Sequence, residues 1–116
     1  MIETDLHGDV VVLTPSDSLD GRRARELREL VEREVGSGRT RFVIDLGAVE
    51  FIDSSGLGAL VWSHRRAAEA GGAVLLCGIG SRVRSLMALT RLDEVLSTRT
   101  GVTAALAELL TSPTGP

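Results

Sequence analysis

The sequence contains no lysine, asparagine, glutamine or tyrosine, and among its 116 residues it has one cysteine, one tryptophan and two phenylalanines. A P-loop and a Schiff-base enzyme both depend on a lysine side chain, so neither is expected. A single cysteine excludes an internal disulfide, and Cys77 lies in an apolar run, where a small buried residue is the usual role. The scarcity of aromatic residues argues against base-stacking platforms for single-stranded nucleic acid.

Long apolar runs and an excess of basic charge are also missing. All 13 basic residues are arginine and the net charge is -3, so we expect no nucleic-acid partner, because such partners require basic surfaces. The longest apolar stretches have the length of strands, so no membrane-spanning segment is expected. The N-terminus is acidic from Glu3 and lacks the regions of a signal peptide, which favours a cytoplasmic protein. The preference for arginine and alanine indicates a GC-rich bacterial genome.

What remains is the composition of a single globular domain, with 43% hydrophobic and 25% charged residues. Short β-branched runs predict strands, and apolar residues at helical spacing predict helices. Strands are expected near residues 2–6, 9–13, 42–46, 73–77 and 95–98, and helices near 20–35, 56–70, 81–90 and 102–110. This alternation predicts an α/β fold with a mixed, mostly parallel sheet that begins with an antiparallel hairpin.

Details of these elements give further expectations. Residues 1–110 are expected to form the domain, and residues 111–116, with two prolines and a glycine, a disordered tail. Residues 15–18 are expected to form a loop, and Asp20 and Ser81 to cap helices. The helix at 56–70 is expected to bury a stripe of five residues: Leu57, Leu60, Val61, His64 and Ala68. Trp62 lies off that stripe and is a candidate partner anchor or a packing residue.

The segment Phe51-Ile52-Asp53-Ser54-Ser55-Gly56-Leu57-Gly58 carries the strongest functional signal. It joins a strand to a helix, and working surfaces of parallel sheets gather beyond the carboxyl ends of strands. We expect its apolar pair in the core, and we expect its two glycines to keep the approach to the hydroxyls open. Free N–H groups and a partial positive charge at the helix start would favour a phosphate on a nearby hydroxyl. From the residues alone, a simple helix cap explains the same pattern.

Residues 42–46 and, four residues later, the same Asp-Ser-Ser-Gly-Leu-Gly segment resemble the STAS domains of bacterial anti-sigma-factor antagonists. The resemblance extends upstream to Leu19-Asp20 and downstream through Ala70-Gly71-Gly72 and residues 74–77, so it covers nearly the whole chain. It implies a single STAS-like domain with about five strands and about four helices. Residues 14–18 differ from the family, which commonly has a glycine there, so this loop is expected to affect the choice of partner.

The resemblance also implies a function. In this family the second serine of the motif is the phosphoacceptor, which corresponds to Ser55. The unphosphorylated antagonist binds an anti-sigma factor that is a serine/threonine kinase, and so frees a sigma factor; phosphorylation releases the antagonist, and a PP2C-type phosphatase resets it. No cofactor is implied. The expected partner-binding residues cluster around the motif: Asp20, Asp53, Ser54, Ser55, Gly56, Leu57 and Trp62.

Three other interpretations stay open at this point. A STAS module could serve as a scaffold or a transport-system accessory without phosphorylation. A hydrolase is disfavoured because a nucleophile elbow needs glycine where Asp53 stands, and only His7 and His64 could act as the base. The Gly78-Ile79-Gly80 segment resembles the start of a dinucleotide fingerprint but lacks its third glycine. With Arg82 and Arg84 nearby, weak nucleotide binding remains an alternative for that loop, while no metal-ligand cluster is present.

Overall fold

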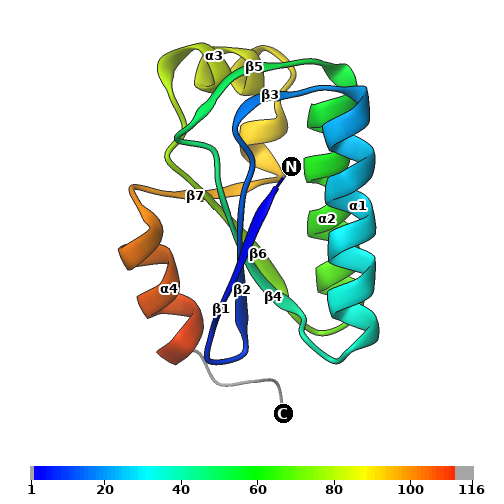
Figure 1. Cartoon of the computed structure of the whole chain (residues 1–116). Helices are drawn as coiled ribbons and strands as arrows, with labels where there is room; N and C mark the ends of the chain where they lie inside the picture. The colour runs from blue at the N-terminus through cyan, green and yellow to red at the C-terminus, as the bar shows by residue number, and fades with distance from the viewer. Residues whose placement is uncertain (1, 112–116) are drawn as a thin grey trace.

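The computed structural model describes residues 2–111. Its centre is a β-sheet whose strands pair mostly in parallel (Figure 1). In chain order the elements are β1 (Glu3–His7), β2 (Val10–Thr14), β3 (Asp17–Leu19), α1 (Gly21–Gly36), β4 (Arg41–Asp45), β5 (Val49–Ile52), α2 (Ser54–Glu69), β6 (Ala73–Cys77), α3 (Ser81–Leu89), the short 3₁₀ helix η1 (Leu92–Glu94), β7 (Ser97–Arg99) and α4 (Val102–Thr111). The main sheet has the order β1-β2-β4-β6-β7, and β3 and β5 form a separate pair. The predicted α/β fold with a mixed sheet is confirmed.

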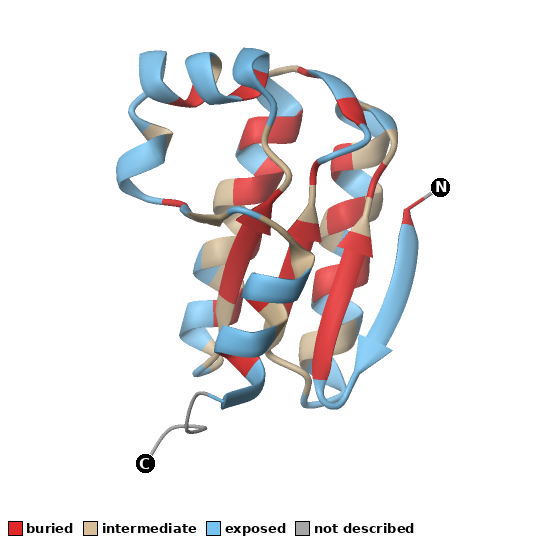
Figure 2. Cartoon of the chain, turned by 90° about the vertical axis from the view of Figure 1, so that its left-hand side faces the viewer, coloured by how far each residue is buried: buried red, intermediate tan, exposed pale blue. Residues whose placement is uncertain are grey.

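The central strands β2, β4 and β6 are almost entirely buried because helices cover both faces of the sheet (Figure 2). Helices α1 and α2 lie on one face and α4 on the other (Figure 1). Only β1 runs antiparallel to its neighbour; the other three pairings of the main sheet are parallel. Each connection between parallel strands therefore carries the chain from one end of the sheet back to the other. The loops that follow β4 and β6 accordingly lie at the same end.

Two apolar clusters, one on each face of the sheet, form the core. The larger joins the sheet to α1, α2 and α3, and the smaller joins it to α4 through Ala105 and Leu109. Cys77 belongs to the smaller cluster and is fully buried. Burial, assisted by the nearby Asp45 charge, raises the pKa of its thiol to about 11, so Cys77 stays neutral. This confirms its role as a small apolar core residue.

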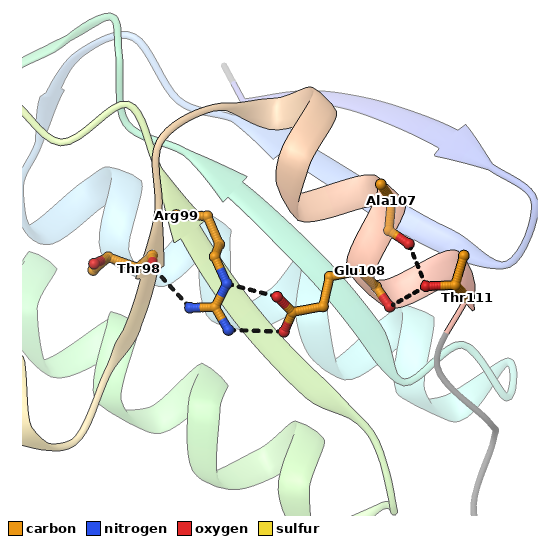
Figure 3. Close-up of polar contacts among 5 residues, drawn as sticks. All are labelled: Thr98, Arg99, Ala107, Glu108 and Thr111. Atoms are coloured by element: carbon orange, nitrogen blue, oxygen red, sulfur yellow. Dashed lines mark hydrogen bonds and ion pairs between the residues drawn. The ribbon is translucent and has the colours of Figure 1, made fainter.

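Arginine side chains tie α4 to the sheet (Figure 3). The Arg99 guanidinium on β7 donates two hydrogen bonds of 2.7 Å to the Glu108 carboxylate on α4 and one of 2.7 Å to the Thr98 carbonyl. On β4, Arg41 donates to the carbonyl of Leu109 and to the Asp9 carboxylate. These contacts fix α4 against the face of the sheet opposite α1 and α2, where it covers the smaller apolar cluster (Figure 1).

One ion pair joins α1 to α2 and should make stability depend on pH. The Arg66 guanidinium donates hydrogen bonds of 2.9 and 3.0 Å to the Glu32 carboxylate and thereby lowers the pKa of Glu32 below its ordinary value. Because the folded pKa lies below the unfolded one, the pair stabilises the fold fully above the unfolded glutamate pKa of about 4.3. That contribution is lost as the pH falls through the folded pKa of Glu32.

We therefore expect Glu32→Gln to lower the free energy of unfolding at pH 7 and to have a smaller effect at pH 3. Urea unfolding at both pH values measures this. Glu29→Gln changes an exposed glutamate of the same helix and is the matched control. A Glu32→Gln effect of equal size at both pH values would show that the ion pair is not its cause.

The structure corrects several details of the predicted elements. Residues 15–18 are not all loop, because β3 begins at Asp17. Residues 49–52 form the unpredicted strand β5. Gly80, not Ser81, is the N-cap of α3, and no side chain caps that helix. Thr111 ends α4, and the rest of the predicted tail lies outside the described residues. Among the helices of residues 2–111, none combines the length and apolarity needed to cross a membrane.

Candidate functional site

The β3–β5 pair places the starts of α1 and α2 side by side (Figure 1). The two strands are parallel, with Leu19 opposite Ile52, and each is followed directly by an aspartate that caps a helix. Asp20 accepts a hydrogen bond of 3.4 Å from the Arg23 N–H. Asp53 accepts one of 2.9 Å from the Gly56 N–H. Two carboxylates and two helix N-termini therefore share one surface, at the end of the sheet that the sequence predicted.

Ser54 and Ser55 are the first two residues of α2, and both are exposed. Asp53 supplies the cap, so the serine hydroxyls are not used for it, and neither accepts nor donates a hydrogen bond within residues 2–111. The backbone N–H groups of these first-turn residues have no acceptor within the helix and carry its partial positive charge. Ser55 thus presents a free hydroxyl to solvent where a phosphate would be favourably placed.

The structural role of Gly56 was not predicted from the sequence. It is buried, and a Cβ at this position would lie 2.1 Å from the Leu19 carbonyl oxygen and 2.8 Å from Cγ1 of Ile52. The glycine therefore lets α2 pack directly against the end of β3, and does not open an approach to the serines. Gly58 is exposed, and a Cβ there would meet nothing within 4 Å, so this second glycine does leave the surface open.

The two glycines predict opposite effects on stability. Gly56→Ala should lower the free energy of unfolding by about 1–3 kcal/mol or more, because the methyl group overlaps the backbone of β3. Gly58→Ala should raise it by up to about 1 kcal/mol, because alanine favours a helix interior over glycine. Urea unfolding of both variants tests this. Equal destabilisation by the two substitutions would contradict the close packing at Gly56.

Trp62 lies half-buried in an apolar groove between α2 and the segment that follows α3. This Trp62 groove has a volume of about 430 Å³ and is lined by Ser54, Leu57, Gly58, Val61, Trp62, Arg65, Thr90 and Leu92.

The predicted buried stripe of α2 is correct for Leu57 and Leu60 but wrong for Ala68, which is exposed. Ala67 and Ser63 are buried in its place, and Ser63 satisfies its hydroxyl with a bond of 2.7 Å to the Ala59 carbonyl.

A second apolar groove lies between β5 and α3. This α3 groove has a volume of about 320 Å³ and is lined by Glu50, Phe51, Ile52, Arg82, Val83, Ser85, Leu86 and Leu89. The expectation that both members of the apolar pair enter the core is wrong for Phe51, which is 53% exposed, while Ile52 is buried. Successive side chains of a strand point to opposite faces, so only one of the two can face the core.

The glycine loop after β6 is explained by packing against the loop after β4. Gly78 has a φ of +69°, and a Cβ there would lie 2.7 Å from Oδ1 of Asp45 and 2.8 Å from the Gly47 nitrogen. The same Asp45 oxygen accepts a hydrogen bond of 2.9 Å from the Gly47 N–H. Tight contact between two loops therefore accounts for this glycine without a nucleotide. Arg82 and Arg84 follow on α3, and both are exposed.

Within residues 2–111, neither histidine forms a hydrogen bond or an ion pair with the serines. The ring of His7 on β1 lies 3.5 Å from the Asp5 carboxylate, at the edge of the sheet. His64 is half-buried, more than two turns along α2 from Ser55. Within residues 2–111, no group of three or more His, Cys, Asp or Glu side chains forms a metal-binding cluster.

Comparison with known proteins assigns the chain and its fold to a family. The profile of the STAS domain matches residues 1–105. An anti-sigma F factor antagonist of Paenibacillus polymyxa is 25% identical over 109 residues, which are 93% of each chain. A Thermotoga maritima crystal structure, provisionally named an anti-sigma factor antagonist, superposes with a TM-score of 0.86 at 26% identity and 94% coverage of both chains. An anti-sigma factor antagonist from Mycobacterium paratuberculosis gives a TM-score of 0.82 at 26% identity, covering 95% of this chain and 93% of that one. This chain belongs to the STAS domain family.

Proposed function

We propose that the chain is a bacterial, cytoplasmic anti-sigma-factor antagonist whose state is set by a phosphate on Ser55. Unphosphorylated, it binds an anti-sigma factor that is a serine/threonine kinase, and the sigma factor is released. The observation that carries this proposal is the exposed Ser55 hydroxyl, which has no partner in residues 2–111 and stands at the start of α2. The similarity to proteins named anti-sigma factor antagonists supports the same role.

The electrostatics of the site explain how a phosphate would end the complex. A phosphoserine adds about 1.5 to 2 negative charges and three acceptor oxygens. In the free protein this charge faces water and the N–H groups at the start of α2, so the fold need not change. In a complex the same charge would be desolvated beside the carboxylates of Asp20 and Asp53, at a cost of several kcal/mol. Since about 1.4 kcal/mol changes affinity tenfold, one phosphate suffices for release.

In this proposal the chain is a substrate and a binding protein, not an enzyme, and it needs no cofactor. Phosphate transfer is the chemistry of the kinase, and its removal that of a PP2C-type phosphatase. The predicted partner surface consists of the seven residues around the capped helix starts: Asp20, Asp53, Ser54, Ser55, Gly56, Leu57 and Trp62. Of these, Gly56 and Leu57 are buried and support the surface from below.

Displacement of the sigma factor tests the proposed function. The purified kinase is first bound to its sigma factor, and the chain is then added with its phosphorylation state checked by intact mass. We expect the unphosphorylated chain to release the sigma factor in a concentration-dependent manner, and Ser55→Ala to release it without being inactivated by ATP. If the chain binds the kinase but leaves the sigma factor in place, it is a scaffold module and the proposal is wrong.

Trp62 is predicted to be an anchor for the kinase. It is the only tryptophan of the chain, and it stays half-buried in a groove that Ser54 also lines. Tryptophan side chains that fill such grooves are frequent binding hot spots, so Trp62→Ala should weaken kinase binding by at least about tenfold. Isothermal titration calorimetry with the unphosphorylated chain measures this effect.

A control separates binding from folding, because Trp62 also packs against the larger core cluster. Trp62→Phe keeps an aromatic side chain in the groove and should bind the kinase more tightly than Trp62→Ala at equal thermal stability. Kinase affinity unchanged in Trp62→Ala would assign the side chain to packing alone.

A further inference from the structure

We propose that the α3 groove is a second docking site for the same kinase and that it receives an apolar segment of the kinase that carries acidic residues. This inference rests on the proposed function and extends its contact surface from the helix starts to α3. The groove lies between one face of α3 and β5, which leads directly into the Asp53-Ser54-Ser55 turn. Figure 1 shows α3 and β5 at the same end of the molecule.

Exposed apolar side chains mark this groove. Leu89 is 82% exposed and Phe51 is 53% exposed, and both line the groove from opposite walls. Folding does not account for Leu89, because α3 already fills the core with Val83 and Met87 on its inner face. A polar residue at position 89 would serve the isolated fold equally well. Large apolar side chains that gather around an open groove are typical of an interaction surface.

The spacing along α3 fits a docking face. Four groove residues of this helix, Arg82, Ser85, Leu86 and Leu89, follow the i, i+3, i+4, i+7 pattern that places side chains on one face of a helix. The face is mostly exposed (Figure 2), and only Leu86 is half-buried. The helix therefore presents one continuous face with an arginine at its beginning and a leucine at its end.

Charge indicates the chemistry of the partner. The chain as a whole has a net charge of -3, yet α3 contains Arg82 and Arg84 and no acidic residue. Arg82 lines the α3 wall of the groove, Glu50 lines the β5 wall, and Arg84 lies outside the lining. Neither arginine forms an ion pair or a side-chain hydrogen bond within residues 2–111. An acidic segment would complement them, and such complementarity accelerates association and selects the partner. A second copy of the chain fits less well, because a twofold contact through α3 would place arginines against arginines.

Position links the groove to the phosphorylation site. Ile52, at the end of the β5 wall, precedes the Asp53 cap directly, and Leu92, beyond the far end of α3, lines the Trp62 groove. The α3 groove is formed by β5 and α3, and the Trp62 groove is formed by the elements that follow them in the chain, α2 and the segment after α3, with Ser54 among its lining residues. A kinase that covers Ser55 can reach both grooves without crossing the sheet.

Substitutions of exposed groove residues test the proposal with the purified kinase that phosphorylates Ser55. Leu89→Ser and Phe51→Ser should each weaken binding of the unphosphorylated chain by about tenfold or more, with unchanged thermal unfolding. Arg82→Glu should weaken binding and also reduce its dependence on salt. The matched control is Leu110→Ser, which changes a leucine that is 48% exposed on α4 and should bind as wild type does.

The outcomes separate this inference from the proposed function. If wild type binds the kinase and gains a phosphate on Ser55, but Leu89→Ser and Phe51→Ser bind equally well, the α3 groove is not a docking site and the proposed function stands. If wild type neither binds the kinase nor gains a phosphate, both are wrong. If the groove variants bind the kinase normally but abolish self-association in sedimentation, a second copy occupies the groove, and the inference is overturned.

Discussion

Ser55→Ala is expected to abolish phosphate incorporation by the kinase, while Ser54→Ala keeps it close to the wild-type level. Both hydroxyls are exposed in the first turn of α2, so exposure alone does not choose between them. The resemblance to the family predicts that Ser55 is the phosphoacceptor, whereas Ser54 lines the Trp62 groove, where we expect apolar contact with the partner. Incubation with the kinase and ATP, followed by intact-mass and fragment analysis, measures the phosphate and its position.

The double variant Ser54→Ala/Ser55→Ala provides the background for this experiment. Phosphate that persists in Ser55→Ala but disappears in Ser54→Ala would transfer the regulatory role to the other serine. Because Asp53 caps the helix in every variant, none of these substitutions should unfold α2.

Ser55→Asp is expected to bind the kinase at least about tenfold more weakly than Ser55→Ala. Binding of Ser55→Asp would desolvate an additional negative charge beside the carboxylates of Asp20 and Asp53. The effect should be smaller than that of phosphoserine, which carries more charge. Calorimetric titration of both variants measures the difference. Ser97→Asp adds the same charge at an exposed serine on β7 and should leave affinity unchanged. Equal affinities of Ser55→Asp and Ser55→Ala would contradict release by charge.

Elements with a strong local signal could be predicted from the sequence. The apolar strands β2, β4 and β6 and the helix that Asp20 caps lie close to their expected places, because β-branched runs and an N-cap act locally. The motif was also placed correctly at the start of a helix, since aspartate and serine are preferred residues at a helix N-cap. Accessibility of Ser55 followed from that placement.

Features that depend on pairing between distant segments were missed. Strands β3 and β5 are three and four residues long and exist only because they pair with each other, so neither has a periodic pattern of its own. Without that pair, the outward direction of Phe51 and the contact of Gly56 with the Leu19 carbonyl could not be deduced. The α3 groove depends on the same pair, because β5 forms one of its walls.

Kinase affinity of one protein sample before and after complete phosphorylation tests the central claim most directly. Intact mass confirms a single phosphate, and amide NMR spectra of the free protein compare the two forms. We expect affinity to fall by about 100-fold or more while spectral changes stay confined to the starts of α1 and α2 and their neighbours. An affinity that survives phosphorylation, or a loss of affinity accompanied by spectral changes throughout the sheet, would contradict release by charge on an unchanged fold.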